Sequence, residues 1–449
     1  MVAYGGDEVN ALVLDIGTST TRAGYAGEDT PRVMFPTSVG YIDTPSIESD
    51  GDTLMTDSTE NKKKRNYFIG DNKINKFRSQ MEITHPLQDG LVNDWDAYEA
   101  IWHATFDDML RIRPEEHPLL CTEPAWNTKE NREKTIELAF EKFEFPAFYL
   151  VPDAVMTAFS VGRATALVLD SGAGVTSAVP VYDGFVLNRG VLHQPLAGNR
   201  LAEKIQEQLK AELNYTITPR FKIAKKKPVE LDQQPELELN ACEGLRESFE
   251  QDQILKIINE YKETVCQLSD VTYDEGLLSS RPKMLFEFPD GYQHQFGIER
   301  YRVSELLFQP NMNQQQKGEE EPRQQQEEEE QDTNQEKESE EKQLLGVHDL
   351  VYNSISACDI DLRPLLFNNV VVTGGNTLIQ GFNERLNYEL PLKAPASKIK
   401  IHAAGNATER KSSSWLGGSI VASLGTFHQL WISRQEYEEH GVSVIHRKC

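Results

Sequence analysis

The sequence predicts an α/β fold in which two similar domains close on one nucleotide. The pattern Leu-Val-Leu-Asp-x-Gly-x-x-x-Thr occurs twice, at 12–21 and at 167–176. Each copy is an apolar strand that runs into an Asp and a turn of small residues. The Asp can hold a hydrated divalent metal, and the turn leaves backbone N–H groups free for phosphate oxygens. A third turn at 370–376, Val-Val-Val-Thr-Gly-Gly-Asn, would approach the rest of that ligand closely.

Apolar runs and amphipathic segments alternate along the chain. Short runs, most of them rich in Val or Leu, predict strands, and longer segments with helical spacing of apolar residues predict helices. The predicted strands lie at 12–15, 22–25, 119–122, 167–170, 177–181 and 370–372. The predicted helices lie at 98–111, 127–143, 153–162, 200–213, 251–268 and 415–426. Sheets flanked by helices follow from this mixture, which is the α/β class.

The chain divides into two predicted domains with three inserted segments. Residues 1–165 and 415–449 form the first domain with the first phosphate turn, and residues 166–414 form the second domain with the second turn. The inserted segments lie at about 43–66, 214–238 and 311–342. The third contains twelve acidic and four basic residues between Gln runs. Such a composition cannot bury enough apolar surface to offset its ordering entropy, so we expect disorder there.

The charged clusters leave alternatives open. The acidic segment is either a solvated loop or a contact for a histone or another basic partner. Lys62-Lys63-Lys64-Arg65 and Lys225-Lys226-Lys227 are either plain surface or nuclear import signals.

Composition restricts the class of protein. The chain has 71 acidic and 46 basic residues, a net charge of −25. This argues against nonspecific binding to nucleic acid and favours partners with basic surfaces. Five scattered cysteines without a Cys-x-x-Cys pair indicate reduced thiols in the cytosol or nucleus. We expect no signal peptide and no membrane span, because the first residues lack an apolar region and no apolar run reaches about 18 residues.

Several segments resemble actin. Residues 15–27 (Asp-x-Gly-x-x-x-x-Arg-Ala-Gly-Tyr-Ala-Gly) resemble its first phosphate loop, and residues 170–176 (Asp-Ser-Gly-Ala-Gly-Val-Thr) resemble its second. Segments 113–118, 128–134 and 358–363 and the tail from 415 to 449 are also similar to actin. The resemblance covers the chain apart from the inserted segments and implies the actin-like fold, shared with hexokinase and heat-shock chaperones. The insertions and substitutions look most like the nuclear actin-related protein four subfamily.

The resemblance implies a nucleotide site that is largely intact, with ATP as cofactor and Mg²⁺ or Ca²⁺ as cation. Asp15 and Asp170 would hold the metal through water. Arg22 replaces the usual Lys and brings a planar, bulkier fork, and Ser19 stands where actin has Gly. The implied nucleotide-binding residues are Gly17, Thr18, Ser19, Thr20, Arg22, Gly172, Ala173, Gly174, Val175, Lys262, Glu263, Gly374, Gly375, Asn376 and Lys411.

The residues for hydrolysis are altered. Hydrolysis needs a water in line with the γ-phosphate and groups that orient it and accept its proton. Where actin has Gln, Asp and His, this chain has Asp153, Ala173 and Ser177. The Ala173 side chain has no oxygen for the metal-bound waters, Ser177 cannot relay a proton as an imidazole would, and Asp153 adds negative charge. We therefore expect the protein to hold ATP without turnover and not to be an enzyme. Asp153 could instead serve as a helix N-cap after Pro152, which would pull its carboxylate away from the phosphate.

Partner binding also follows from the resemblance. The altered 43–66 region and the mobile charge of 311–342 predict a monomer that forms no filaments. Phe159, Leu424, Leu430 and Trp431 predict a groove for an amphipathic helix, although they could also be ordinary core. The implied partners are nuclear actin, the helicase-SANT-associated helix of a remodeller ATPase or acetyltransferase scaffold, and histones. The implied setting is the nucleus, in chromatin remodelling, histone acetylation, transcription regulation and DNA repair.

Three rival functions remain. A slow actin-type ATPase is compatible with Asp15 and Asp170. A sugar kinase or chaperone of the same fold is disfavoured, because the chain follows actin to its last residues. A cytoplasmic filament-forming actin would need the segment at 43–66 to restore the filament contacts.

Overall fold

The two copies of the sequence repeat form matching β-hairpins. The computed structural model describes residues 10–44, 64–312 and 344–449. In the first hairpin β1 (Leu12–Ile16) pairs antiparallel with β2 (Thr20–Tyr25), which places Asp15 opposite Arg22. In the second, β11 (Ala166–Ser171) pairs in the same way with β12 (Thr176–Tyr182), which places Asp170 opposite Ser177.

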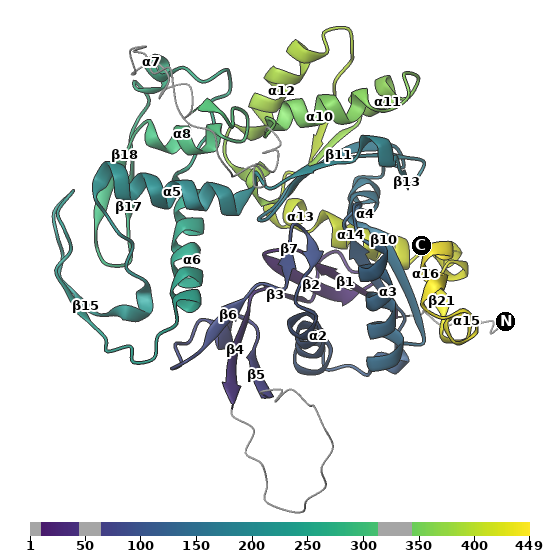
Figure 1. Ribbon diagram of the computed structural model, residues 1–449. Coiled ribbons are helices and arrows are strands. Elements are labelled where there is room, and N and C mark those ends of the chain that lie inside the picture. Colours follow the sequence, from purple (N-terminus) through teal and green to yellow (C-terminus); the bar gives the residue numbers. More distant parts are fainter. Residues whose placement is uncertain (1–9, 45–63, 313–343) are drawn as a thin grey trace, which may run out of the picture.

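Each hairpin is the centre of a mixed sheet, and the two sheets share a topology (Figure 1). The added strands of the first sheet are β3 (Val33–Pro36), β9 (Leu119–Glu123), β10 (Ala147–Pro152) and β21 (Ile432–Ser433), in the order β21-β10-β9-β1-β2-β3. Those of the second are β13 (Phe185–Val186), β14 (Leu192–Gln194), β19 (Val370–Thr373) and β20 (Ile401–Ala403), in the order β13-β12-β11-β19-β20 with β14 on β12. Beyond each hairpin the next two strands run parallel. The repeat therefore extends from ten residues to whole sheets.

Smaller strand pairs lie outside the two sheets. They are β4 (Val39–Thr44) with β5 (Lys64–Phe68) and β6 (Glu82–Thr84), β7 (Leu87–Gln88) with β8 (Leu91–Val92), β15 (Ile223–Lys226) with β16 (Leu237–Leu239), and β17 (Met284–Glu287) with β18 (Gln293–Phe296).

Helices cover the sheets and join them. The longer α-helices are α2 (Trp95–His103), α3 (Lys129–Glu137), α4 (Asp153–Ser160), α5 (Gly198–Leu213), α6 (Glu247–Val265), α10 (Val347–Ser356), α12 (Phe382–Lys393) and α14 (Ser413–Ala422). The shorter ones are α1 (Asp71–Ile74), α7 (Glu275–Leu278), α8 (Glu299–Glu305), α11 (Arg363–Phe367), α13 (Ala407–Lys411), α15 (Arg434–His440) and α16 (Ile445–Lys448). Among the described residues, no helix is long and apolar enough to cross a membrane.

Short 3-10 and π-helical segments connect these elements. The 3-10 segments are Pro114–Glu116, Asn188–Gly190, Arg220–Lys222, Gly375–Leu378, Gly425–Gln429 and Val442–Val444, and the π-helical ones are Ala104–Leu110 and Leu138–Lys142.

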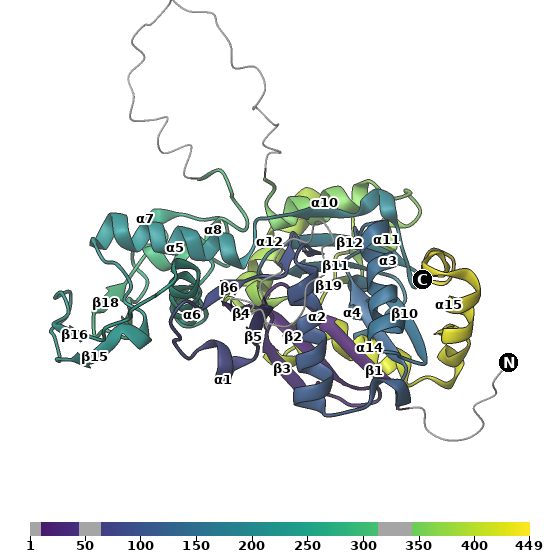
Figure 2. The ribbon, with the colours of Figure 1, turned by 60° about the horizontal axis from the view of Figure 1, so that its bottom comes forward.

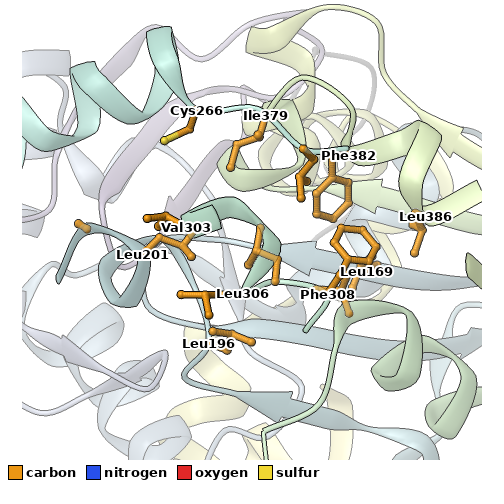
Figure 3. Packing of buried hydrophobic residues seen from close by; sticks show 14 of the residues in the cluster. Leu169, Leu196, Leu201, Cys266, Val303, Leu306, Phe308, Ile379, Phe382 and Leu386 are labelled. Atoms are coloured by element: carbon orange, nitrogen blue, oxygen red, sulfur yellow. The ribbon is translucent and has the colours of Figure 1, made fainter. Parts of the chain in front are cut away.

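The two sheets are joined by α4 and α14, which pack on each other between them (Figures 1 and 2). α14 contacts β1 and β9, whereas α4 contacts β11 and β12. The crossing is so close that a Cβ on Gly417 would overlap the carbonyl oxygen of Met156. The largest core lies on the other side of the second sheet, where Leu169 packs with Phe308 and Phe382 (Figure 3).

The predicted α/β class and each predicted strand and helix are confirmed, with ends shifted by a few residues. Two predicted helices each consist of an α-helix that continues as a π-helix. The helix predicted at 98–111 is α2 followed by the π-helix Ala104–Leu110, and the helix predicted at 127–143 is α3 followed by the π-helix Leu138–Lys142. Asp94 and Thr128 cap α2 and α3 by accepting the N–H groups of Ala97 and Asn131. The boundaries of the two predicted domains stay a prediction.

The three segments predicted as insertions differ in how much of each the structure describes. Most of 43–66 lies outside the described residues, and its ends belong to β4 and β5. The segment 214–238 forms β15 and the start of β16, and each lysine of its cluster pairs with a glutamate. Exposed ion pairs of this kind are weak and leave the lysines accessible, so both interpretations of the cluster stay predictions. The predicted disorder at 311–342 concerns residues that, from 313 on, lie outside the described part.

Candidate nucleotide and metal site

The turns of the two hairpins face each other. Each turn is closed by the same backbone hydrogen bond, from Gly17 N–H to Thr20 O at 3.1 Å and from Gly172 N–H to Val175 O at 3.0 Å. A Cβ on Gly174 would lie 2.8 Å from the Thr18 methyl carbon, so the turns are in contact. The structure thereby brings the two sequence-predicted phosphate turns together.

Asp15, at the end of β1, is held by three neighbours. Thr122 Oγ1 donates to Asp15 Oδ1 at 2.7 Å, Ser414 Oγ lies 3.4 Å from the same atom, and Arg22 Nη1 contacts Oδ2 at 3.2 Å. Arg22 Nη1 also lies 3.3 Å from Thr20 O. The guanidinium therefore lies against Asp15 and the first turn, where it offsets the charge of the carboxylate.

Asp170 occupies the equivalent place in the second hairpin with fewer partners. Its buried Oδ1 has no hydrogen-bond partner among the described residues. Burial and the nearby Asp15 carboxylate raise the pKa of Asp170 to about 6, although Arg22 opposes this shift. A buried carboxylate oxygen without a partner is costly unless a cation or a donor approaches it. Asp170 therefore fits the role of a metal-facing group better than Asp15 does.

Asp153 is the first residue of α4. Its Oδ1 accepts the N–H of Ala154 at 2.6 Å, and the N-cap position itself is taken by Pro152. Burial, followed by the Asp170 and Asp15 carboxylates, raises the pKa of Asp153 well above its usual range. Pro152 and not Asp153 is the N-cap residue, so the predicted N-cap role of Asp153 is not found, and its carboxyl group lies close enough to Asp170 and Asp15 for them to raise its pKa.

The third turn closes around the second. Gly374 has φ 94°, and a Cβ there would overlap Asp170 Oδ1 and the Ser171 carbonyl oxygen. Asn376 Nδ2 donates to Gly172 O at 2.7 Å and to Ser171 Oγ at 3.1 Å. Glycine is required at 374 both by its backbone conformation and by this close approach. The turn at 370–376 thus lies against the second phosphate turn, as the sequence predicts.

The residues predicted to meet the base and ribose lie beside these turns. Lys262 Nζ donates to Gly198 O at 3.1 Å, and Gly198 N–H donates to Gly172 O at 3.0 Å. Burial lowers the pKa of Lys262 to about 8. Lys411 and Glu263 form an ion pair with Nζ and Oε1 2.9 Å apart. The predicted residues of both halves therefore gather around one region.

Some members of the site were missed by sequence reasoning. Thr122 ends a predicted strand beside β1, so its place next to Asp15 could have been inferred from the parallel pairing. No sequence pattern predicted Gly198 and Ser414 as members of the site, because they reach it from the starts of α5 and α14, which are distant from the turns in sequence. Thr37 also supports the first turn by donating to Gly17 O at 2.7 Å.

The altered positions keep their places near the second turn. Ala173 lies in the turn, and its carbonyl oxygen accepts Asn199 N–H at 2.7 Å. Ser177 lies opposite Asp170 on one side and opposite His193 of β14 on the other. The ring of His193 is stacked on Trp126 with centroids 4.3 Å apart.

The predicted partner groove is only partly exposed. Leu424 and Leu430 are 50% and 46% exposed, and Phe159 is half-buried. Trp431 is buried against Phe427 and Tyr149, so it belongs to the core and not to the surface. Sequence reasoning missed two exposed apolar residues of the neighbouring elements, Phe185 in β13 and Ile420 in α14.

Comparison with known proteins decides the family. The family model described as Actin matches residues 6–449. The chain belongs to the actin family. It is 40% identical to actin-related protein 4 of Yarrowia lipolytica over 98% of this chain and 95% of that protein. It is 39% identical to actin-related protein 4 of Schizosaccharomyces pombe and 36% identical to that of Mycosarcoma maydis, over 99% of each chain in both cases.

Membership of the actin family implies a nucleotide and a divalent cation in this region. The donor set fits such a cation, because Asp170 offers an unpartnered carboxylate oxygen and Asp15 lies close enough to perturb its pKa. Within the described residues no group of three or more His, Cys, Asp or Glu forms a metal cage. Few protein ligands, with water and phosphate completing the shell, are typical of Mg²⁺.

Proposed function

We propose that this actin-family protein binds ATP with a divalent cation as a structural cofactor and hydrolyses it little or not at all. One observation carries the proposal: both phosphate turns keep the same closed geometry, whereas positions 153, 173 and 177 lack the groups that would activate water. Binding and hydrolysis use different residues of one site, so the first can persist without the second.

The residues of the site have separate roles in this proposal. The N–H groups of both turns would bind phosphate oxygens, and Asp170 would face the cation. Arg22 would orient the Asp15 carboxylate, which it contacts at 3.2 Å, instead of reaching far along the phosphates. The raised pKa of Asp153 favours its neutral form, which would add less negative charge near the phosphates than a carboxylate. The cation, when bound, would neutralise phosphate charge.

The identity of the retained nucleotide tests the proposal. The purified chain is left in Mg-ATP for many hours, and the bound nucleotide is then extracted and identified. We expect ATP at close to one per chain. ADP in its place would overturn the absence of hydrolysis, and a protein without nucleotide would overturn the cofactor role.

A slow actin-type ATPase is the second candidate, and one observation favours it. His193 lies directly across from Ser177 on the neighbouring strand, so the two side chains share a face of the sheet. An imidazole is thus present one strand away from the place where actin has its His. If His193 activates water, replacing it with Gln will abolish the slow appearance of ADP. If ATP persists equally in both proteins, this candidate is excluded.

We further propose a nuclear role as a subunit of chromatin-remodelling and histone acetyltransferase complexes. The apolar surface of Phe159, Phe185, Ile420, Leu424 and Leu430 would receive a helicase-SANT-associated helix beside nuclear actin. The support is the exposure of Phe185, Ile420, Leu424 and Leu430 and the similarity to proteins named actin-related protein 4. The net charge of −25 suits a basic helix and basic histones.

Charge substitution in the groove tests this role. Leu424→Glu should weaken capture of such a helix by at least about tenfold, because a carboxylate would be buried in an apolar contact. Leu392→Glu is the control, since Leu392 is 62% exposed on α12, away from α14. Equal capture by wild type and Leu424→Glu would move the docking surface elsewhere.

A further inference from the structure

A separate apolar cluster joins the two halves of the molecule away from the phosphate turns. Ile74, Met81 and Ile83, from the segment between β5 and β7, are buried together with Phe249 of α6. In both views β6 lies beside α6 (Figures 1 and 2). Ile74, Met81 and Ile83 lie in the part of the chain between strands β3 and β9 of the first sheet, so they belong to the first half. Helix α6 belongs to the half built around the second sheet. The cluster therefore bridges the two halves.

Three phenylalanines complete this cluster. Phe77 is stacked on Phe221 with centroids 5.6 Å apart and planes at 6°, and it also contacts Phe249 at 5.9 Å. Phe221 and Phe249 are 5.0 Å apart. We call the group Ile74, Phe77, Met81, Ile83, Phe221 and Phe249 the clasp. Aromatic pairs of this kind add to the stabilisation that their buried area already provides.

Polar contacts surround the clasp and also run between the halves. Gln80 N–H donates to Gly244 O at 2.8 Å, and Ile83 N–H donates to Ser248 Oγ at 3.0 Å. Lys256 Nζ lies 2.6 Å from Asn75 Oδ1. Backbone groups and a buried apolar cluster together distinguish this contact from a chance meeting of surface side chains.

The segment predicted as inserted at 214–238 supplies Phe221 and fixes it on α6. Lys222 pairs with Glu250 at 2.5 Å, and Arg220 pairs with Glu260 at 2.5 Å. Two ion pairs to one helix flank Phe221 in sequence, and its ring is placed by its contacts with Phe77 and Phe249. The segment thereby has a structural task that its polar composition does not suggest.

The clasp is connected to the nucleotide site through α6. Phe249 lies near the start of this helix and Lys262 near its end, about 20 Å apart at the rise of an α-helix. The halves meet at the phosphate turns with α4 and α14 and at the stacking of His193 on Trp126, and the clasp joins them at a separate place. Separated contacts oppose the relative rotation that would open the region between them.

We propose that the clasp, completed by Phe221, holds the two halves closed over the bound nucleotide and limits the rate of its release. The inference rests on the proposed nucleotide site. Phe77 and Phe221 are positioning residues, because they contact neither turn and act through α6. The consequence is a kinetic one: nucleotide exchange requires the clasp to open first.

Release of a fluorescent ATP analogue, chased by excess ATP, measures this effect. We expect at least about tenfold faster release from Phe77→Ala and from Phe221→Ala, because each removes a ring from the clasp. Gly244→Ala keeps every ring but places a Cβ against Ser79 and Gln80 across the contact, so it should accelerate release as well. Tyr352→Ala is the control, since this half-buried ring packs on the second-sheet core. If Phe77→Ala, Phe221→Ala and Gly244→Ala all released the analogue at the wild-type rate, the proposal would be overturned.

A cross-linking experiment separates the clasp from the nucleotide site. Glu82 and Arg246 form an ion pair across the contact at 3.6 Å. Cysteines at both positions, in a Cys242→Ser and Cys449→Ser background, should be joined rapidly by a short bismaleimide, and Phe77→Ala should slow this reaction. Slow cross-linking in the chain with Phe77 intact would overturn the clasp. Rapid cross-linking in a chain that binds no nucleotide would overturn the proposed cofactor role and leave the closed contact standing.

Discussion

Asp15, Asp153 and Asp170 bring three carboxyl groups into one buried region, and Arg22 offsets part of their charge. Two of these groups have raised pKa values because burial and mutual repulsion disfavour the ionised form. Without a ligand, the site therefore stores unfavourable electrostatic energy. A cation beside Asp170 would relieve this repulsion. Cation binding at Asp170 would therefore also stabilise the fold.

The pH dependence of stability tests this account at Asp170. A folded-state pKa of about 6 against an unfolded value of about 3.9 means that Asp170 stabilises the fold most below pH ~4. That contribution is lost as pH rises through about 6, at a cost of about 2–3 kcal/mol. Asp170→Asn should remove this decline in the nucleotide-free, cation-free chain. Urea unfolding of both proteins between pH ~4.5 and ~7.5 measures it, and parallel curves would contradict the account.

Gly374 and Gly375 are adjacent, but we expect alanine at these two positions to have different effects on the stability of the ligand-free fold. A Cβ at 374 would meet Asp170 and Ser171 in a backbone conformation that favours glycine, whereas nothing lies within 4 Å of one at 375. Gly374→Ala should therefore lower the free energy of unfolding by about 2 kcal/mol or more without any ligand. Gly375→Ala should leave the ligand-free fold nearly unchanged and weaken ATP binding. Unfolding with and without ATP distinguishes them, and equal destabilisation of the ligand-free chain would refute the distinction.

At the scale of elements, α8 and α12 are fixed to each other by a fully buried ion pair. Arg385 of α12 donates to both carboxylate oxygens of Glu305 of α8, at 2.7 and 2.9 Å, and both side chains are 0% exposed. Arg385 also pairs with Glu389 at 2.7 Å and lies over the ring of Phe308. Burial raises the pKa of Glu305 to about 6 even though Arg385 opposes the shift. Loss of Arg385 would leave the fully buried Glu305 carboxylate without its cation.

Arg385→Met should therefore lower the free energy of unfolding by about 3–5 kcal/mol. The double variant Glu305→Leu/Arg385→Met removes the two fully buried charges and leaves Glu389, whose side chain is 12% exposed, so it should recover part of this loss. Chemical unfolding of the wild type, the single variant and the double variant measures the difference. A double variant as unstable as the single one would show that packing, and not charge, dominates here.

The sequence predicted the elements that carry a dense local signal. The two Leu-Val-Leu-Asp strands and α5 were predictable because apolar spacing and turn residues agree there. β10 was missed because Ala147–Pro152 ends in proline and is followed directly by a helix. The π-helical ends of α2 and α3 were not predictable, since i→i+5 bonding leaves the apolar pattern of a helix nearly unchanged.

The candidate site was predictable in its turns and not in its long-range contacts. Asp15, Asp170 and Gly374 were found because each follows an apolar strand. The direction of Arg22, toward Asp15, depends on antiparallel register, which places the two residues opposite each other. The burial of Trp431 and the position of Phe221 in the clasp arise from elements far apart in sequence, so no local pattern reports them.

On the scale of the whole molecule, charge and shape act together on self-association. The net charge of −25 opposes contact between copies at low salt. The actin-like segment 358–363 nevertheless keeps an exposed apolar side chain, since Ile360 is 72% exposed. The predicted monomeric state has two candidate causes: electrostatic repulsion, or filament contacts that the altered sequence at 43–66 no longer provides.

Sedimentation of the Mg-ATP-bound chain at high protein concentration distinguishes the two causes. Salt shortens the range of repulsion from about 30 Å at 0.01 M to about 3 Å at 1 M. If charge alone prevented assembly, filaments would appear as salt rises through this range. We expect a monomer at every salt concentration, because the sequence of segment 43–66 differs from that of actin and screening cannot restore specific contacts. Actin under the same conditions is the control, and salt-induced pelleting of this chain would show that its filament surface is intact and only masked by charge.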